Sequence, residues 1–329
     1  MDEVLKIKDL KVSFKQRYGK LEAVRGVSLS VRKGEILALV GESGCGKSVT
    51  ARSVLKLNDV SGGQMAAEEL WLGGRDILAA SEKEMLEIRG KLAGMIFQDP
   101  LTFLNPTMKV GKQVTETLRR HGKKTAAECK AEAVRLLEMV QIPEASIRAN
   151  QYPHQFSGGM RQRAMIAMAL ACRPALLIAD EPTTALDPTI QKQILALLKN
   201  MQTEQQTSVL MITHDLSVVA NAADRVAVMY AGKIAEECQV GRLFEKPAHP
   251  YTRGLIDSLP TLEKEKELRA IKGAPPDLAM LPKGCAFAPR CDACMKICLM
   301  EEPPEIQIEE GHKTSCWLYH RDNPKGGIA

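Results

Sequence analysis

The sequence predicts an α/β fold, with antiparallel strands at the start of the chain and a buried parallel sheet flanked by helices further on. β-branched apolar runs separated by turn residues occupy the beginning of the chain, and residues 175–182 (ALLIADEP) form a short continuous apolar run that is typical of a buried parallel strand. Apolar residues recur at helical spacing over residues 160–172. With 329 residues, 45% of them hydrophobic, the chain can bury a sizeable core and is expected to hold more than one structural unit.

Charge and aromatic content argue against a nucleic-acid-binding protein. The 45 basic and 40 acidic residues give a net charge of +5, which is small for this length, and only 4% of the residues are aromatic. No apolar run reaches the roughly 20 residues of a membrane-spanning helix. The opening MDEVLKIKDL lacks the apolar core of a signal peptide. We therefore expect a cytosolic protein that reaches a membrane only through partners.

Three apolar runs at residues 4–14, 24–31 and 35–40 predict a strand meander, with a turn at residues 32–34. The third run leads into GESGCGKS at residues 41–48, followed by a helical stretch at 48–57. Gly-x4-Gly-Lys-Ser between a strand and a helix is the pattern of a phosphate-binding loop. Its glycines let successive backbone N–H groups surround phosphate oxygens, and the helix N-terminus adds its positive end.

Within this loop, Lys47 is predicted to reach the β- and γ-phosphates, and the Ser48 hydroxyl is predicted to bind Mg²⁺. The residues expected to contact the nucleotide here are Gly41, Ser43, Gly44, Cys45, Gly46, Lys47, Ser48 and Val49.

Two carboxylates end the apolar run at residues 175–182. Asp180 is predicted to hold Mg²⁺ through water, and Glu181 to orient and polarise the attacking water, because phosphoryl transfer depends mainly on positioning and charge stabilisation. A further apolar strand, SVLMITHD, reaches His214 at its tip. We expect His214 to contact the γ-phosphate.

Ser-Gly-Gly occurs twice, and its position distinguishes the two copies. FSGGMRQR opens the helical run at residues 160–172, so Ser157 and the amides of Gly158 and Gly159 are expected at a helix N-terminus, where anions bind. VSGGQM instead follows the helix after the phosphate loop and precedes a hairpin, EELWLGGRDI. We interpret residues 61–64 as a flexible turn without a role in catalysis.

In this order, the phosphate loop, FSGGMRQR, LLIADEP, TALD (residues 184–187) and MITHD resemble the ATPase subunits of ATP-binding cassette (ABC) transporters. Three further segments are similar to sequence motifs of the bacterial dipeptide and oligopeptide (peptide/nickel) importers: IFQDPLTFLNP, YPHQFSGGM and HPYTRGL. The general resemblance covers residues 4–245, and the importer-type resemblance continues to about residue 320.

The resemblance implies a P-loop, RecA-like ABC ATPase core with an antiparallel β subdomain at residues 1–98 and 166–245. It also implies a helical signature subdomain at residues 99–165 and a small Cys-rich C-terminal extension at residues 246–329. The implied activity is ATP hydrolysis coupled to import of dipeptides, oligopeptides or a related solute. The implied location is the cytoplasmic face of the cytoplasmic membrane.

The same resemblance implies that two cassettes clamp two ATP molecules, so that the signature segment of one acts on nucleotide held by the other. That segment here is Ser157, Gly158, Gly159 and Met160. Gln98 matches a residue that links Mg²⁺ and the attacking water to the membrane subunits, and Asp187 matches a cross-dimer contact. Tyr18 matches an adenine-stacking aromatic, with Phe14 as the alternative. Phe156 replaces the usual signature leucine, and Met160 stands where glutamine is common.

The implied partners are a second, related but distinct cassette, two membrane permease subunits and, indirectly, an external solute-binding protein. No nucleic acid is expected. An alternative is a soluble ABC-type ATPase in translation or DNA repair, although such proteins carry paired cassettes or long coiled coils, and this chain has one phosphate loop and no sustained heptads. An iron–sulfur redox or nucleic-acid protein that also binds ATP is a third hypothesis, disfavoured by charge and composition.

Nine cysteines in a reducing compartment are not expected to form disulfides. Five of them fall within residues 285–316, and their spacing alone allows either zinc or an iron–sulfur cluster. The importer resemblance implies a 4Fe–4S cluster with a structural or regulatory role; zinc and unligated cysteines are the alternatives. The ligands it implies are Cys285, Cys291, Cys298 and Cys316, leaving Cys294 as an extra thiol.

Overall fold

An antiparallel sheet forms one layer of the computed structural model, which describes residues 2–16, 19–99, 103–122, 125–183, 187–259 and 270–321. Its strands are β1 (Glu3–Gln16), β2 (Gly19–Arg32), β4 (Gly63–Ala66), β5 (Glu69–Leu72) and β6 (Arg75–Asp76). They run in the order β2-β1-β5-β6, and β4 also pairs with β1. The hairpin predicted around EELWLGGRDI is confirmed as β5 and β6.

A second, eight-stranded sheet carries the phosphate loop. Its strands are β3 (Ile36–Val40), β7 (Ala93–Ile96), β8 (Leu176–Asp180), β9 (Ser208–Thr213), β10 (Arg225–Tyr230), β11 (Lys233–Gln239), β12 (Ile306–Glu309) and β13 (His312–Thr314). The order is β12-β13-β11-β10-β3-β9-β8-β7, and the strands from β10 to β7 are parallel.

The meander prediction is wrong for its third strand, because β3 leaves the antiparallel sheet and lies between β10 and β9. All five β3 residues are buried, as expected of a central strand that is covered on both faces. Leu37 and Leu39 pack into the core shared with the antiparallel sheet, whereas Ile36, Ala38 and Val40 pack into the core on the opposite side. β3 therefore joins the two hydrophobic cores.

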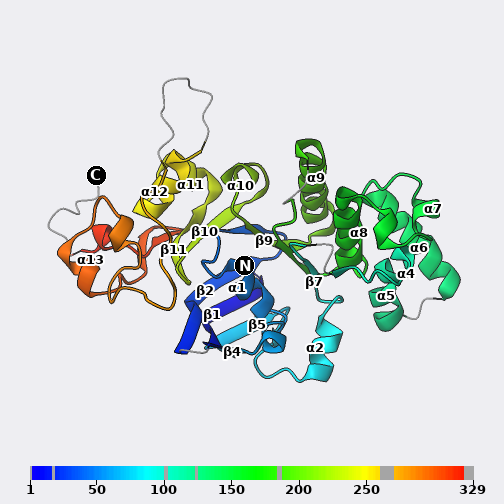
Figure 1. Ribbon diagram of the computed structural model, residues 1–329, viewed down its shortest axis with the longest axis horizontal. Helices are drawn as coiled ribbons and strands as arrows, with labels where there is room; N and C mark the ends of the chain where they lie inside the picture. Colours follow the sequence, from blue (N-terminus) through cyan, green and yellow to red (C-terminus); the bar gives the residue numbers. More distant parts are fainter. Residues whose placement is uncertain are drawn as a thin grey trace.

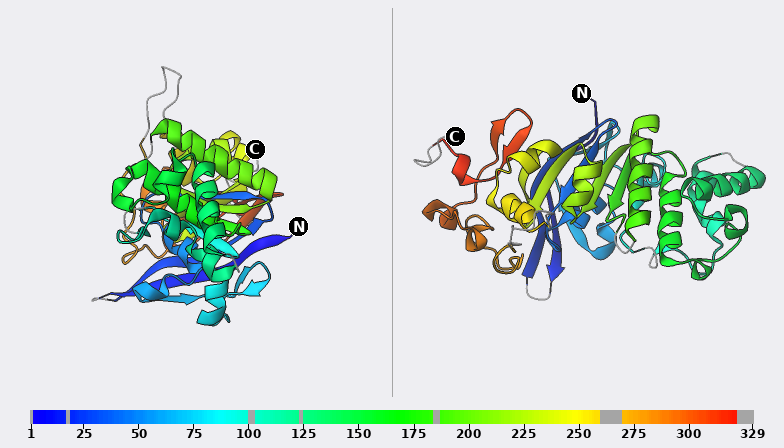
Figure 2. Two further views of the ribbon diagram at one scale, coloured as in Figure 1. Left: turned by 90° about the vertical axis from the view of Figure 1, so that its right-hand side faces the viewer. Right: turned by 90° about the horizontal axis from the view of Figure 1, so that it is seen from above.

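Helices lie at both ends of the eight-stranded sheet (Figure 1, Figure 2). A helical group at one end comprises α4 (Val110–Val114), α5 (Glu116–His121), α6 (Ala126–Met139), α7 (Ala145–Arg148) and α8 (Gly158–Leu170). The others are α1 (Lys47–Ser53), α2 (Glu82–Ile88), α9 (Pro188–Gln205), α10 (Leu216–Ala222), α11 (Val240–Glu245), α12 (Pro250–Asp257) and α13 (Lys296–Met300). None of these described helices is long and apolar enough to cross a membrane.

Helix α1 is shorter than the stretch predicted at residues 48–57. It ends at Ser53, and Lys56 has a left-handed φ of 51°, which a continuing right-handed helix does not allow. The prediction for residues 61–64 is wrong in part. Residues 59–61 form a 3₁₀ turn, but Gln64 lies within β4, where it pairs with Ser13 of β1.

The C-terminal segment, by which we mean residues 246–259 and 270–321, extends the core sheet. Its hairpin β12–β13 pairs with the edge strand β11, at Glu236 with Thr314 and at Glu237 with Lys313. Figure 1 shows this segment at the opposite end of the molecule from the helical group. The segment is therefore continuous with the eight-stranded sheet.

The carboxylate of Glu236 fastens the C-terminal segment to β11. It is fully buried and accepts hydrogen bonds of 2.8 Å from the backbone N–H groups of Ala248 and His249 and from Nε2 of His312. Burial alone would raise the pKa of Glu236, but the hydrogen bonds from His312 and these N–H groups outweigh it, and the pKa is lowered from 4.5.

We expect Glu236→Ala to lower the free energy of unfolding by about 3–5 kcal/mol, because it leaves His312 and two buried N–H groups without their acceptor. Glu309→Gln, at a half-exposed carboxylate also near His312, is the matched control, expected to cost less than about 0.5 kcal/mol. Because the folded pKa of Glu236 is depressed, its contribution is present above pH 4.5 and is lost as the pH falls through the folded value. Urea unfolding measures the free energy of unfolding of both variants. Equal decreases in the two would contradict the role of Glu236 as the buried acceptor that attaches the C-terminal segment.

Candidate nucleotide-binding site

The phosphate loop connects the end of β3 to the start of α1, and two of its glycines are required by close packing. A Cβ atom at Gly46, where φ is 107°, would lie 2.4 Å from the carbonyl oxygen of Ala23 in β2. A Cβ atom at Gly41 would lie 2.2 Å from the carbonyl oxygen of Met229 in β10. Both distances are shorter than any Cβ atom tolerates, so the loop follows this path only with glycine.

The Lys47 side chain is folded back onto the loop. Its Nζ atom donates hydrogen bonds to the carbonyl oxygens of Gly41 (2.7 Å) and Glu42 (2.9 Å), and the residue is buried. The ammonium group thus lies at the centre of the loop, where phosphate oxygens are predicted to bind.

Ser48 and Asp180 meet at the edge of the sheet. The Ser48 hydroxyl donates to Oδ1 of Asp180 at 2.7 Å, whereas Oδ2 of Asp180 is buried and accepts no hydrogen bond; Nη2 of Arg52 lies 3.7 Å from it. Burial raises the pKa of Asp180, and the Ser48 hydrogen bond and the Arg52 charge offset this only in part. A buried carboxylate oxygen without a donor, beside a hydroxyl, fits the oxygen ligands that Mg²⁺ or its bound water takes.

Glu181 lies between Gln98 and His214. Nε2 of Gln98 donates to Oε2 of Glu181 at 2.9 Å, and Nδ1 of His214 lies 3.3 Å from Oε1 of Glu181. Glu181 has a left-handed φ of 50°, uncommon outside glycine, and its backbone N–H donates to the carbonyl oxygen of Ile212 in β9. Three residues predicted to be catalytic, from the ends of three neighbouring strands, are therefore in contact.

The signature segment begins α8, away from the phosphate loop. Ser157 is the N-cap residue, and its hydroxyl accepts a hydrogen bond from the N–H of Met160 at 3.3 Å. Ser157 and Gly158 are exposed, and Gly159 follows in the first turn. Among the described residues, no hydrogen bond or ion pair joins residues 157–160 to the loop. Gln162 instead donates to the carbonyl oxygen of Pro182, which connects α8 to the segment after Glu181.

The remaining predicted nucleotide contacts are placed as follows. Asp187 is exposed and caps α9, where its side chain accepts from the N–H groups of Thr189 and Ile190, both at 3.0 Å. Tyr18 and the rest of the TALD motif, residues 184–186, lie outside the described residues. Phe14, the alternative stacking residue, is half-buried in β1 opposite Gly63 of β4.

The four predicted cluster ligands line one cavity in the C-terminal segment. Cys285, Cys291, Cys298 and Cys316 surround it, together with aromatic and aliphatic side chains, whereas Cys294 is exposed and does not line it. Burial raises the pKa of Cys291 to about 11 and that of Cys316 to about 12, so these thiols are protonated unless a cation binds them.

Several residues at the site are not apparent in the sequence. Arg52 is one turn after Ser48 on α1, but its partner Asp180 is distant in the sequence, and nothing in the spacing relates the two. Gln162 is a polar residue in an otherwise apolar helix face, which is a weak signal for a buried contact. Glu42 also receives contacts from the C-terminal segment, which the sequence does not indicate.

Comparison with known proteins follows the same division of the chain. Residues 24–184 match the ABC transporter family, and residues 235–298 match the oligopeptide/dipeptide transporter C-terminal region. The chain is 56% identical over 324 residues to the oligopeptide transport ATP-binding protein OppD of Bacillus subtilis (strain 168), covering 98% of this chain and 90% of that protein. It is 50% identical over 319 residues to the dipeptide transport ATP-binding protein DppD of the same strain, covering 97% and 95%.

Among solved structures, the dimeric bacterial ABC transporter cassette MJ0796 superposes with a TM-score of 0.66 at 28% identity, covering 72% of this chain and 98% of that one. The same score, identity and coverage apply to a dimeric post-hydrolysis state of that cassette bound to ADP and Pi. The predicted P-loop ABC ATPase fold is confirmed. This chain belongs to the ABC transporter family of ATP-binding proteins, in the group with the oligopeptide/dipeptide transporter C-terminal region.

Proposed function

We propose that this chain is the ATP-hydrolysing subunit of an importer that takes up oligopeptides or dipeptides. The observation that carries the proposal is the convergence of two groups at the carboxyl ends of β3, β7, β8 and β9: Ser48 with Asp180, and Gln98 with Glu181 and His214. Ligands and reacting groups gather at this edge of a parallel sheet. The relatives with peptide-transport names match this chain over nearly its whole length.

In this proposal each group has a separate task in ATP hydrolysis. Lys47 turns from the carbonyl oxygens of Gly41 and Glu42 to the β- and γ-phosphates, where its charge offsets theirs. Ser48 would bind Mg²⁺ directly and Asp180 would hold it through water; the ion would supply positive charge to offset that of the phosphates.

Glu181 orients the attacking water and accepts its proton at a carboxylate oxygen, with Gln98 and His214 fixing the carboxylate from either side. Gln98 would also contribute to the Mg²⁺ site, and His214 would contact the γ-phosphate.

We infer that residues 157–160 act on nucleotide held by a partner cassette. The exposure of Ser157 and Gly158 at the start of α8, together with the exposure of Asp187 at the start of α9, supports this, because a partner's nucleotide or loop can reach both helix N-termini. The N–H of Met160, which donates to the Ser157 hydroxyl in this structure, belongs to the backbone and does not depend on the side chain, so the departure from glutamine is compatible with this role.

We further propose three units: a nucleotide-binding core (residues 1–98 and 166–245), a helical unit (residues 99–165) that docks on two permease subunits, and the Cys-rich C-terminal extension (residues 246–329). Helix α8 continues through Leu170 and so connects the first two mechanically. The assembly includes a second, distinct cassette and receives solute from an external binding protein, which places this chain on the cytoplasmic face of the membrane.

Purification of the tagged chain from membranes, with mass spectrometry of every copurifying subunit, tests the function. The proposal predicts two permeases and a second cassette, with ATP turnover of the reconstituted assembly increased by a peptide-loaded binding protein. Copurification with ribosomes or DNA, in place of permeases, would contradict it.

We also propose that the cysteine-lined cavity holds a 4Fe–4S cluster with a structural or regulatory role. A mononuclear zinc site with Zn–S distances of about 2.3 Å places its sulfurs about 3.8 Å apart. In the described residues, no three of these cysteine sulfurs lie within 4.8 Å of one another, since the one group that does is Glu236, Cys238 and His312. Thiolates around several irons are farther apart, and this supports the cluster over the zinc alternative.

We expect Cys316→Ser to remove most of the bound iron and the broad visible absorbance from anaerobically purified protein, because a cluster that loses one of four thiolates is poorly held. Cys294→Ser is the matched control, since its thiol is exposed and outside the cavity, and it should retain both signals. Metal analysis and absorbance spectra measure the outcome. Stoichiometric zinc in a colourless wild-type protein would overturn the cluster.

A further inference from the structure

Glu42, the second residue of the phosphate loop, is held by the C-terminal segment through its side chain and its backbone. Its carboxylate accepts a forked pair of hydrogen bonds from Arg290, at 2.7 and 2.9 Å, and its N–H donates to the Tyr251 hydroxyl at 2.9 Å. The Arg290 side chain is 6% exposed and that of Glu42 is 24% exposed. Two elements distant from the loop in sequence, α12 and the 3₁₀ turn Ala288–Arg290, thus reach the same loop residue.

The Arg290 guanidinium is fixed by further acceptors. Nε donates to the carbonyl oxygen of Lys272 (2.8 Å), Nη1 to the Tyr230 hydroxyl (3.3 Å) and Nη2 to the carbonyl oxygen of Gly273 (3.4 Å). Together with the pair to Glu42, these bonds use all five N–H donors of the group. A buried guanidinium with every donor engaged has one orientation, so it holds the Glu42 carboxylate in a defined place.

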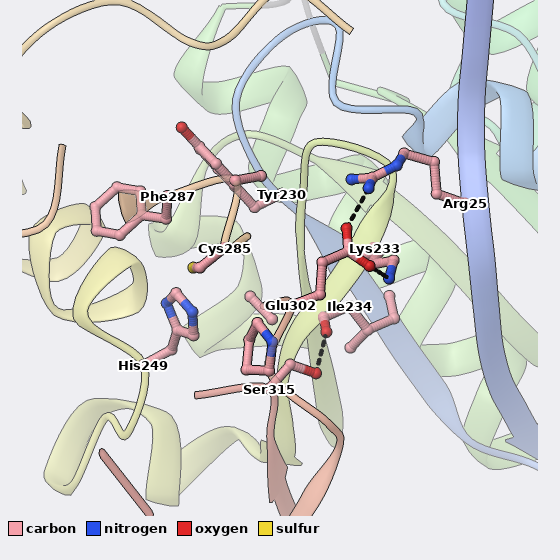
Figure 3. A pocket seen from close by; sticks show the side chains of 12 residues that line it. Arg25, Tyr230, Lys233, Ile234, His249, Cys285, Phe287, Glu302 and Ser315 are labelled. Atoms are coloured by element: carbon pink, nitrogen blue, oxygen red, sulfur yellow. Dashed lines mark hydrogen bonds and ion pairs between the residues drawn. The ribbon is translucent and has the colours of Figure 1, made fainter. Parts of the chain in front are cut away.

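Aromatic contacts hold the two tyrosines that take part. The ring of Phe287 packs against Tyr230 and Tyr251 at centroid distances of 5.2 and 5.4 Å, and the two tyrosines pack on each other at 4.5 Å. Figure 3 shows Tyr230 and Phe287 beside Cys285 in the adjoining pocket. The hydroxyl groups that meet Glu42 and Arg290 therefore extend from a packed cluster.

Glu42 also accepts a hydrogen bond from Lys47, at its carbonyl oxygen. When a triphosphate enters, Lys47 is expected to leave this oxygen for the phosphates. Glu42 then keeps one hydrogen bond from within the loop, from the N–H of Cys45 at 3.4 Å, and the contacts from the C-terminal segment. In addition, the Glu42 carboxylate lies in the loop that receives a polyanion. Arg290 neutralises this charge, which would otherwise repel the phosphates.

We propose that Arg290 and Tyr251 are positioning residues for nucleotide binding: by holding Glu42 they fix the phosphate loop, so that the C-terminal segment forms part of the nucleotide site. The inference rests on the proposed function, in which this loop binds ATP. If these contacts only stabilised the fold, variants of Arg290 and Tyr251 would lower the free energy of unfolding without a specific loss of nucleotide affinity.

Another connection between the C-terminal segment and the core provides a matched control. Glu302 accepts hydrogen bonds from Arg25 in β2 and Lys233 in β11, which Figure 3 shows across the pocket from Phe287. Glu302→Gln weakens the attachment of the same segment without touching the loop. The change in nucleotide affinity of Glu302→Gln therefore measures how much a weaker attachment of the C-terminal segment affects binding when the phosphate loop is untouched.

The test is the dissociation constant of Mg-ATP for the purified assembly, measured by a fluorescent ATP analogue and competition. Arg290→Met is expected to raise it about 10- to 100-fold, because the carboxylate of Glu42 is left unpaired beside the phosphates. The double variant Arg290→Met with Glu42→Gln should recover only the part of the affinity that the unpaired charge costs. It should still bind Mg-ATP more weakly than the wild type, because the forked pair that holds the loop is absent. Turnover at saturating ATP should change less than twofold, because Glu181 is untouched.

Tyr251→Phe keeps the ring contacts and removes one hydroxyl, and it tests the same inference if Arg290→Met folds poorly. It is expected to raise the dissociation constant about 3- to 10-fold. An unchanged constant in both variants, or an equal rise in Glu302→Gln, would overturn the inference. If Lys47→Met also leaves ATP binding unchanged, the proposed function fails as well; if Lys47→Met alone loses binding, only this inference fails.

Discussion

Replacing Glu181 with glutamine is expected to lower ATP turnover of the assembled transporter by about 10²- to 10⁴-fold, the usual contribution of a general base. The amide still accepts a hydrogen bond from Gln98, so the geometry is largely kept while the proton acceptor is lost. Nucleotide affinity should therefore remain near the wild-type value, and ATP should accumulate uncleaved in the closed cassette pair. Phosphate release and trapped-nucleotide assays measure the two quantities.

The control for this variant is Asp215→Asn, next to His214. Asp215 caps α10 through the N–H of Ser217, and asparagine caps a helix about as well as aspartate. Turnover of this variant should stay within about twofold of wild type. If Glu181→Gln hydrolyses ATP at the wild-type rate, Glu181 is not the base.

Lys47→Met is expected to raise the dissociation constant of Mg-ATP by about 10²- to 10⁴-fold, because two charge-assisted hydrogen bonds to phosphate are lost, each about 1.5–3 kcal/mol. Methionine fills a similar volume, so the loop should keep its path. Equilibrium binding of a fluorescent ATP analogue measures the effect.

The matched control is Lys56→Met, whose Nζ also donates to two carbonyl oxygens, those of Leu78 and Ala80, but away from the loop. Both variants lose two hydrogen bonds of the same kind, whereas only Lys47→Met should lose affinity. Comparable affinities for the two variants would contradict the placement of the phosphates.

The features predictable from the sequence are those set by local pattern. Gly-x4-Gly-Lys-Ser after an apolar run places a loop between a strand and a helix, and Asp180 and Glu181 follow a run with no polar residue before its end, so their position at a strand tip is fixed by burial. Ser157 at the start of α8 follows from helix-capping preference.

Long-range pairing is what the local pattern does not contain. β3 has the same alternation-free apolar character whether it ends a meander or enters a parallel sheet, and its neighbours β9 and β10 come much later in the chain. The contact of Arg290 with Glu42 depends on how residues 270–290 pack beside α12, and no spacing rule encodes it. The same applies to the hairpin β12–β13, which joins β11 through tertiary packing.

A structure of the assembled transporter carrying Glu181→Gln, determined with Mg-ATP bound, tests the central claim most directly. The account predicts a triphosphate against residues 41–48, sandwiched by the Ser-Gly-Gly turn of the partner cassette, with Ser157 of this chain at the partner's nucleotide. A nucleotide bound elsewhere on this chain, or Ser157 far from any nucleotide in the closed assembly, would contradict it.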